Sequence, residues 1–243
     1  MFSFWKKKKE PVDLSWLGVD MHSHLIPGID DGAPDMVSSI SYIKELQQLG
    51  YRKIITTPHI LSGLYPNTPD NILSGLDALK KELAAQQINI EVQAAAEYFI
   101  DEYFQGLLKD KKPLLTLKDN LVLVEVSMLT APLDLQDVLF EMQLQQYQPV
   151  LAHPERYIYL RSRIEYFEEI KNAGAQFQLN LLSLTGYYGA HARDLAEYLL
   201  QKGMYDYAGT DLHGHRHLEK LKTLSSAPTY TALKEANLKN ATL

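Results

Sequence analysis

Two histidines, His22 and His24, flank a single serine directly after a short apolar run, and the carboxylate of Asp31 follows seven residues later. Imidazole nitrogens and carboxylate oxygens are common protein ligands of divalent ions. A His-x-His pair by itself is a weak signal, because it often occurs by chance. Whether residues 19–35 begin a metal site therefore depends on what the rest of the chain supplies.

Further side chains of the same kinds lie at the ends of later apolar runs. They are His59 in TTPHI, Glu97 in AAAEYF, Glu125 in LVLVEVS, His153 in LAHPERY, and Asp211 and His213 in GTDLH. Singly, each has an ordinary explanation as a hydrogen-bonded loop histidine or an ion-pair partner. Glu125 is the most informative, because an unpaired carboxylate in a buried strand is costly and a metal ion would satisfy it. Together these nine side chains predict a metal site.

Nine ligands exceed what one four- to six-coordinate ion can use. Their number favours two or three ions that share bridging carboxylates, and the absence of sulfur ligands suits manganese, iron, zinc or magnesium. Such a cluster lowers the pKa of a bridging water and clamps the oxygens of an in-line displacement. The chemistry indicated is hydrolysis, most commonly of phosphate esters.

The elements that must position these residues are short apolar runs that alternate with segments of helical period. We expect strands at 19–22, 53–57, 90–95, 121–126, 149–152, 176–180 and 207–209. Helical spacing of apolar residues predicts helices from Met36 to Leu49, from Leu135 to Met142, from Ile164 to Ile170, and from about His191 to Met204.

Alternating strands and helices imply a parallel sheet with crossover helices. Seven such repeats favour a closed or nearly closed (β/α) barrel, with a doubly wound open sheet as the alternative. In parallel α/β folds the carboxyl ends of the strands form the active face. The predicted ligands therefore project from one rim, where Asn180, Glu155 and Arg156 also lie.

Composition limits the classes of function. The 243 residues suffice for one large domain, which we place at 17–243 behind a basic and aromatic tail at 1–16. The net charge of -6 argues against nucleic-acid binding. The chain has no cysteine, which excludes thiolate ligands and cysteine nucleophiles and fits a cytoplasmic location. No stretch is apolar enough for a membrane span, so membrane contact is at most peripheral.

The ordered segments DMHSHLIPGIDDGAPD, TTPHI, AAAEYF, LVEVS, LAHPERY and GTDLH resemble the polymerase and histidinol phosphatase (PHP) superfamily. Within it they are similar to the bacterial manganese-dependent tyrosine-protein phosphatases of capsule and exopolysaccharide operons. The match covers about residues 17–220. It implies a distorted seven-stranded (β/α) barrel in a single domain. It also implies hydrolysis of phosphotyrosine on a protein, with a bacterial tyrosine kinase as the expected substrate.

The resemblance also implies roles for the site residues. One ion would be held by His22, His24, Glu97 and Asp211; a second by Glu97, Glu125 and His153; a third by Asp31, His59 and His213. Catalytic roles would fall to Arg156, Asp211 and Arg216. Arg156 would bind the substrate phosphate as a bidentate fork. Arg216 is a second candidate for this, in a segment, HGHRHLEK, that is shorter than the family pattern.

Three other functions remain open on the sequence. A small-molecule phosphatase of the same superfamily, such as one acting on histidinol phosphate, would use the same site. An amidohydrolase also opens with His-x-His, but its fourth strand usually carries a lysine, where this chain has Glu125. A non-enzymatic binding module would be expected to lack some ligands. Six tyrosines near the expected rim could flank a phosphotyrosine ring or simply pack: Tyr65, Tyr98, Tyr103, Tyr157, Tyr187 and Tyr188.

Overall fold

The computed structural model describes residues 11–132, 134–160 and 163–243. Residues 1–10 of the predicted tail lie outside this part. The rest of that tail packs on the domain, because Val12 and Leu14 are buried in the main hydrophobic core. Within the described residues, no helix has the length and apolar character needed to cross a membrane.

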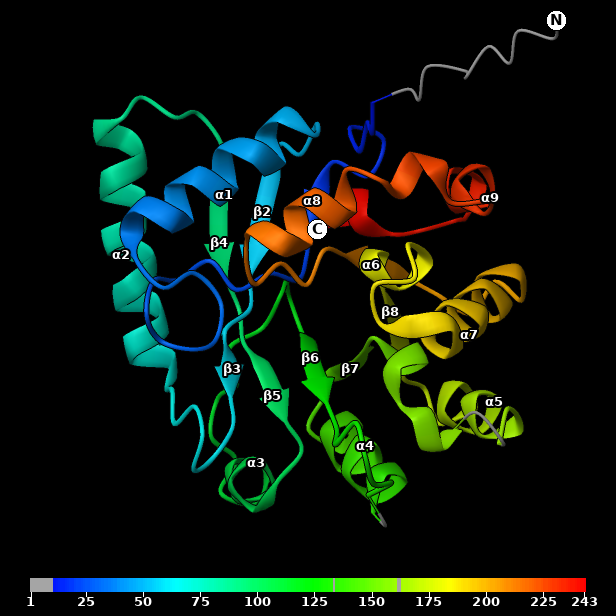
Figure 1. Ribbon diagram of the computed structural model, residues 1–243. Helices are drawn as coiled ribbons and strands as arrows, with labels where there is room; N and C mark the ends of the chain where they lie inside the picture. Colours follow the sequence, from blue (N-terminus) through cyan, green and yellow to red (C-terminus); the bar gives the residue numbers. More distant parts are fainter. Residues whose placement is uncertain (1–10, 133, 161–162) are drawn as a thin grey trace, which may run out of the picture.

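Parallel strands form the centre of the molecule, and helices surround them (Figure 1). One sheet has the order β1-β2-β4 and the other the order β3-β5-β6-β7-β8-β9, and every strand pair in them is parallel. The strands are β1 (Val19–Asp20), β2 (Lys53–Thr56), β3 (His59–Ile60), β4 (Glu91–Ala94), β5 (Glu97–Phe99), β6 (Leu121–Glu125), β7 (Gln148–Ala152), β8 (Gln176–Asn180) and β9 (Tyr207–Gly209).

The two sheets are joined because two stretches of chain each contribute to both. β2 and β3 follow one another with only Thr57 and Pro58 between them, and β4 and β5 are separated only by Ala95 and Ala96. Pro58 has no N–H to donate to a ladder, so a break in regular pairing at this point is expected. The strand positions therefore follow the chain order of the seven predicted strands, and β3 and β5 are two further short strands just beyond the predicted ends of the second and third.

The first and last strands meet along a seam that closes the barrel. Ser23 and Leu212 form a parallel bridge just beyond β1 and β9. The buried carboxylate of Asp20 accepts hydrogen bonds from the backbone N–H of Thr210 at 2.9 Å and from its hydroxyl at 2.7 Å. Burial raises the pKa of Asp20 to about 6, against the opposing effect of these two bonds. The outcome is the predicted distorted (β/α) barrel.

Helices cover the outside of the strands, with α1 and α2 on one side and α5 and α7 on the other (Figure 1). The helices are α1 (Met36–Gln48), α2 (Pro69–Ala85), α3 (Glu102–Lys109), α4 (Leu135–Leu144), α5 (Glu165–Asn172), α6 (Leu181–Leu184), α7 (Gly189–Gln201), α8 (His215–Leu221) and α9 (Tyr230–Glu235). Short 3-10 turns lie at η1 (Pro154–Arg156), η2 (Ile158–Leu160), η3 (Leu224–Ser226) and η4 (Asn240–Thr242).

Local sequence explains where the helices beside the site begin. The Asp35 carboxylate accepts from the N–H of Ser38 at 2.7 Å and starts α1. Thr68 caps α2 in a reciprocal capping box, with Pro69 in the first turn. The Asp101 carboxylate accepts from the N–H of Phe104 at 2.9 Å and starts α3. The four predicted helices are confirmed as α1, α4, α5 and α7, each within a few residues.

Strand alternation explains how polar residues reach the barrel interior. In β6, Leu121 and Leu123 pack with an inner cluster of apolar residues, whereas Val122 and Val124 join the main core outside the sheet. A period of two places Glu125 on the same side as Leu123. The apolar inner cluster thus fills the barrel, and the ligand-type residues follow it at the carboxyl ends of the strands.

Candidate metal centre

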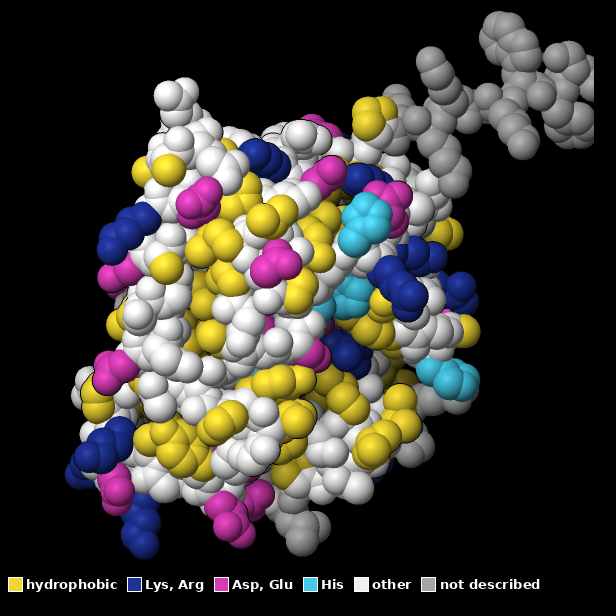
Figure 2. Space-filling model, turned by 60° about the vertical axis from the view of Figure 1, so that its left-hand side comes forward, with side chains coloured by type: hydrophobic (Ala, Val, Ile, Leu, Met, Phe, Trp, Pro, Cys, Tyr) yellow, Lys and Arg dark blue, Asp and Glu magenta, His cyan; other side chains and the backbone are white. Residues whose placement is uncertain are grey.

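The structure brings all nine predicted ligand residues to one end of the barrel. Eight of them fall into three overlapping groups whose nitrogen or oxygen atoms lie within 4.8 Å of one another, and His153 adjoins them through Glu97. The groups are His22, His24, Glu97 and Asp211; His59, Glu97 and Glu125; and His24, Asp31, His59 and His213. Figure 2 shows histidine side chains beside acidic and basic side chains in the middle of one face.

The first group is fully enclosed. The Nε2 atom of His22 lies 3.1 Å from Glu97 Oε2 and 3.4 Å from Asp211 Oδ1, and His24 Nε2 lies 3.4 Å from each of the same two oxygens. The two Nε2 atoms are 3.3 Å apart. Ligands placed about 2.1 Å from one ion in tetrahedral or octahedral geometry are separated by roughly 3.0–3.5 Å. These distances therefore fit four ligands around one cation.

Glu97 is shared with a second group. His59 Nδ1 lies 3.2 Å from Glu97 Oε2 and 3.0 Å from Glu125 Oε1. His153 Nε2 lies 3.0 Å from the other oxygen of Glu97. The sequence-based grouping placed His59 only in the outer site, whereas here its Nδ1 faces Glu97 and Glu125. Glu97 thus belongs to both groups, with Oε2 facing His22 and His59 and Oε1 facing His153.

The third group lies at the mouth of the site. Asp31 Oδ1 is 3.5 Å from His59 Nε2 and 3.4 Å from His213 Nε2. The ring of His213 stacks on that of His24, with centroids 3.9 Å apart. The Asp31 side chain is 53% exposed, while the other carboxylates of the cluster are buried. Solvent and ligands would therefore approach from the side of Asp31.

Two residues that the sequence did not single out fix the orientation of the inner histidines. The Nδ1 atom of His22 lies 2.9 Å from Gln178 Oε1, and the Nδ1 atom of His24 lies 2.8 Å from Asp30 Oδ2. Since both partners are acceptors, each Nδ1 carries a proton and each Nε2 is directed toward the cluster, where a bound cation would take the place of its proton. Such outer hydrogen bonds are typical of metal-bound histidines.

The charges in the cluster shift one another's pKa values. Burial lowers the pKa of His22, but the charges of Glu97 and Asp211 outweigh burial and raise it to about 9. Burial raises the pKa of Glu97, whereas His22 and His59 hold it well below its usual range. The pKa of Asp31 is lowered to about 2, because the hydrogen bond and charge of His213 outweigh burial. The carboxylates of Glu97 and Asp31 are therefore anionic at neutral pH.

Two buried atoms support the fit of a cation. His59 Nδ1 and Glu97 Oε2 have no hydrogen-bond partner among the described residues, although each faces charged neighbours within 3.5 Å. Buried polar atoms without partners are rare and costly. A divalent ion bound between these nitrogen and oxygen atoms would satisfy both. The donor set, with no sulfur, suits manganese, iron, zinc or magnesium.

Arg156 lies beside the cluster in the turn η1. Its guanidinium donates to Asp211 Oδ2 at 2.7 Å and stacks over the ring of Tyr188, 4.1 Å from the ring centroid. Asn180 donates to the same oxygen of Asp211 at 2.7 Å and to the hydroxyl of Tyr188 at 3.2 Å. The Arg156 side chain is 22% exposed, so part of it faces solvent next to the ligand residues.

The backbone is strained at two ligand positions. His153 and Asp211 have positive φ angles, 35° and 48°, in the left-handed region that non-glycine residues rarely adopt. Strain of this kind clusters at functional sites. The buried Glu155 carboxylate holds the turn after His153, because it accepts from the N–H of Asn180 at 3.0 Å and from the hydroxyl of Tyr205 at 2.9 Å.

Arg216 and His217 lie on α8. Arg216 is exposed, and no contact ties it to the cluster within the described part of the chain. His217, which the sequence analysis left out, lies with Nδ1 3.0 Å from the carbonyl oxygen of Asp211, and its ring packs edge-on against Tyr187 with centroids 4.8 Å apart. Its position four residues after His213 was the available signal.

Comparison with known proteins shows which family this chain resembles. The family model for capsular polysaccharide synthesis, CpsB/CapC, matches residues 18–235. Tyrosine-protein phosphatase YwqE of Bacillus subtilis is 32% identical over 197 residues, which cover 80% of this chain and 77% of the relative. Tyrosine-protein phosphatase CpsB of Streptococcus agalactiae is 28% identical over 201 residues, with 80% and 82% covered.

A solved structure agrees with the fold. It comes from the pair YwqE of Bacillus subtilis and CpsB of Streptococcus pneumoniae, described as unique metal-dependent tyrosine phosphatases. It superposes with a TM-score of 0.79 at 28% sequence identity, and the match covers 91% of this chain and 89% of that one.

Proposed function

Because this chain belongs to the CpsB/CapC family of capsular polysaccharide synthesis proteins, we propose that it is a metal-dependent protein-tyrosine phosphatase. Its substrate is phosphotyrosine on a protein, and a bacterial tyrosine kinase that regulates capsule or exopolysaccharide synthesis is the expected one. The absence of cysteine removes the thiol route to a phosphoenzyme and fits a cytoplasmic location.

The cofactor is two or three divalent ions, with manganese the leading candidate. Its support is the overlap of the three ligand groups, since His24, His59 and Glu97 each belong to two of them. One isolated ion would leave most of these donors unused. Bound ions would supply a water of lowered pKa and neutralise charge on the phosphoryl oxygens.

The residues around the ions do the binding and positioning. Gln178 and Asp30 hold His22 and His24 with Nε2 directed into the cluster. Arg156 uses part of its guanidinium on Asp211, and the remaining N–H groups are available to a phosphate. Its stacking on Tyr188 fixes the plane of the fork. A bidentate fork matches a phosphate geometrically, which is why we assign this role to Arg156 and not to the exposed Arg216.

The tyrosine leaving group needs little general-acid help from the protein. A tyrosine phenol has a pKa of about 10, so its anion departs with less help from a general acid than an alkoxide needs. None of the described residues has to be assigned as a strong acid for the reaction to proceed. The same site could accept a small phosphate ester, so substrate size must be tested directly.

The observation that carries the proposal is the buried bridging position of Glu97 between His22, His59 and His153. The test is elemental analysis of the purified protein, followed by chelation and manganese add-back during hydrolysis of a phosphotyrosine peptide. We expect two or three ions per chain, with activity lost and regained alongside them.

The double variant His22→Ala, His24→Ala provides the control. We expect it to remain folded by circular dichroism, to lose bound metal and to lose turnover. Full activity in this variant without metal would refute the mechanism. If the wild-type protein binds metal and hydrolyses small esters but not the peptide, its substrate is a small-molecule phosphate.

A further inference from the structure

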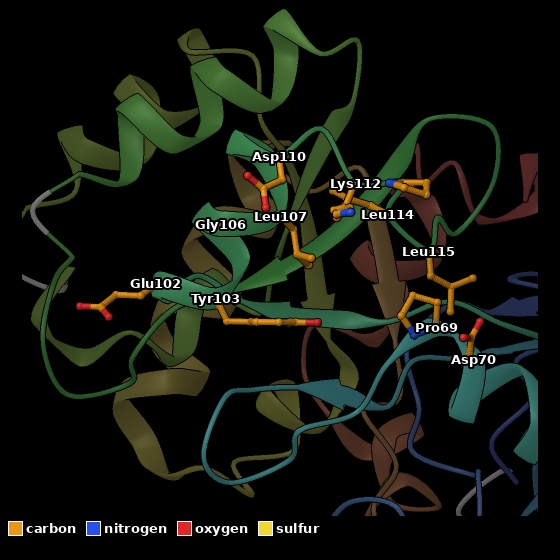
Figure 3. Close-up of a pocket in the computed structure, with 11 residues that line it drawn as sticks. Pro69, Asp70, Glu102, Tyr103, Gly106, Leu107, Asp110, Lys112, Leu114 and Leu115 are labelled. Atoms are coloured by element: carbon orange, nitrogen blue, oxygen red, sulfur yellow. The ribbon is translucent and has the colours of Figure 1, made fainter.

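A groove of about 820 Å³ lies away from the ligand cluster, between the start of α2, helix α3 and the segment that follows α3 (Figure 3). Its apolar lining comes from Tyr103, Leu107, Leu114, Leu115 and Pro69. In Figure 3 the ring of Tyr103 extends from α3 toward Pro69. Tyr103 is 41% exposed, and Figure 2, with the α2 side brought forward, shows hydrophobic side chains across the lower part of that face.

A second hollow of about 240 Å³ adjoins the groove at Tyr103, which lines both. Its lining also includes Ile60, Ser62 and Pro66. Ser62 and Pro66 belong to the loop whose Tyr65 ring stacks on that of His59, with centroids 5.4 Å apart. The two hollows therefore lie next to a loop that borders the metal centre.

Hydrogen bonds fix the residues around the two hollows. The carboxylate of Asp101 accepts from the N–H of Ser62 at 3.0 Å while it caps α3 through Phe104. Asn67 donates to the carbonyl oxygen of His59 at 2.9 Å and accepts from the Asn71 side chain at 2.8 Å. The loop between β3 and α2 is thus tied to β3, α2 and α3, and a chain lying along it would meet a preformed surface.

The rim of the groove is predominantly acidic. Asp70, Glu102 and Asp110 line it and are exposed, and Lys112 is the one basic residue among those that line it. Exposed carboxylates around apolar side chains favour an occupant that carries both apolar and basic residues.

We propose that this groove binds the polypeptide that flanks the phosphotyrosine of the substrate, and that it selects a flank with apolar and basic side chains. The proposal rests on the phosphatase function above. A phosphotyrosine held at the cluster would leave its flank beside the loop 61–67, whose Tyr65 stacks on His59. Eight extended residues of that flank reach about 26 Å.

The experiment compares substrates that differ only in their flank. The short probes are a small aryl phosphate and the tripeptide Ala-pTyr-Ala. Two long peptides extend this tripeptide by eight residues that contain Leu and Lys. One carries the extension on its N-terminal side and the other on its C-terminal side. A further pair replaces Lys by Glu. We expect one of the long Lys peptides to show a lower KM than the tripeptide and than its Glu counterpart.

Two groove variants test the assignment. Tyr103→Ala should raise KM for that long peptide about fivefold, as for a typical contributing interface residue. Asp110→Lys should weaken or reverse the preference for Lys over Glu. Both should leave hydrolysis of the aryl phosphate and the tripeptide unchanged. Matched controls are Phe140→Ala on α4 and Glu168→Lys on α5, which are exposed and outside the groove.

The outcomes separate the two proposals. If wild-type protein hydrolyses the tripeptide and all long peptides with the same KM, the groove assignment is wrong and the phosphatase function stands. If Tyr103→Ala slows the aryl phosphate as much as the long peptide, the residue acts on the site itself and the groove assignment is again wrong. If no phosphotyrosine peptide is hydrolysed, both proposals fail.

Discussion

Gln178 contacts two of the histidines at the site and is itself buried in β8. Its Oε1 atom accepts from His22 Nδ1 at 2.9 Å and from the backbone N–H of His153 at 3.2 Å. An amide oxygen at this position holds one histidine in the tautomer that binds metal and also fixes the strained turn at the other. A neutral side chain does this without adding charge to a cluster that already holds several carboxylates.

Replacing this amide tests how much orientation contributes to metal binding. Gln178→Leu should weaken manganese binding about 10- to 100-fold, the usual effect of removing an outer hydrogen bond from a ligand histidine. Titration calorimetry on chelated protein would measure it. Gln176→Leu is the matched control, because it lies on the same strand and its Oε1 has no hydrogen-bond partner among the described residues. Equal affinity in the two variants would contradict the role of Gln178.

Arg156 carries the second prediction at this scale. Arg156→Lys keeps the positive charge but removes the planar fork, so inorganic phosphate should inhibit about tenfold less strongly, a loss of roughly 1.4 kcal/mol. Metal content should not change, because the guanidinium contacts Asp211 Oδ2 while Oδ1 faces the histidines. Inhibition constants and elemental analysis on the same preparation would show both. A parallel loss of metal would mean that Arg156 supports the ligand and not the phosphate.

Single residues were predictable from sequence where they broke an apolar pattern. Glu125 interrupts a buried strand, and the structure places it against His59. Gln178 interrupts β8 in the same way but was missed, because an amide can be satisfied in many ways. Asp30 was missed for another reason: the adjacent Asp31 offers the same carboxylate, and only the fold shows that one contacts Nδ1 of His24 while the other lies at the mouth.

At the scale of elements, the barrel depends on how its first strand meets its last. The side chain of Asn240, in η4, donates to the carbonyl oxygens of Val19 and Ala208, and its Oδ1 accepts from the N–H of Ala208 at 2.9 Å. Asn240 is only 1% exposed. The Asn240 side chain thus joins β1 to β9 at Val19 and Ala208, where the two strands do not form hydrogen bonds with each other.

Removing that side chain should therefore loosen the seam. Asn240→Ala should lower the free energy of unfolding by about 2–4 kcal/mol, since buried backbone groups left without a partner cost about 1–3 kcal/mol each. Urea denaturation would measure the change. Asn237→Ala, a nearby exposed position, is the control. If both variants unfold at the same urea concentration as wild type, η4 does not hold the seam.

The elements themselves were largely predictable, and their interruptions were not. The seven strand positions follow from alternating apolar runs, and α1 from its apolar stripe and the glycine after it. The strand β3, which resumes just after Pro58, was not foreseen. There the N–H of Thr57 donates to the carbonyl oxygen of Ser23 at 2.6 Å. Such pairing is non-local, so no window of sequence around residue 57 contains it.

For the whole molecule, the formal charge of -6 and the metal centre are connected. The acidic ligands are gathered at one end of the barrel, and bound divalent cations would reduce the net charge of the folded protein. Bound ions would change the pKa values of the ligand groups. The effect of pH on folding is therefore simpler to interpret at a charged network away from the metal centre.

Asp206 forms such a network between distant parts of the chain. Its carboxylate accepts from Lys171 on α5, from the N–H of Phe177 on β8, and from Lys239 at 2.8 Å near the C-terminus. Burial raises its pKa, but the hydrogen bonds of Lys171 and Lys239 outweigh burial and lower it. A lowered pKa in the folded state means that ionised Asp206 stabilises the fold.

This stabilisation should have a defined pH range. It is fully present above the unfolded pKa of about 3.9 and is lost as the pH falls through the lower folded value. Asp206→Asn should therefore cost about 1–3 kcal/mol at pH 7. The difference from wild type should shrink as the pH falls below about 4. Urea unfolding of chelated protein across this range would measure it, with the exposed Asp77→Asn as control. A difference that stays constant at every pH would mean that Asp206 acts through packing and not through its charge.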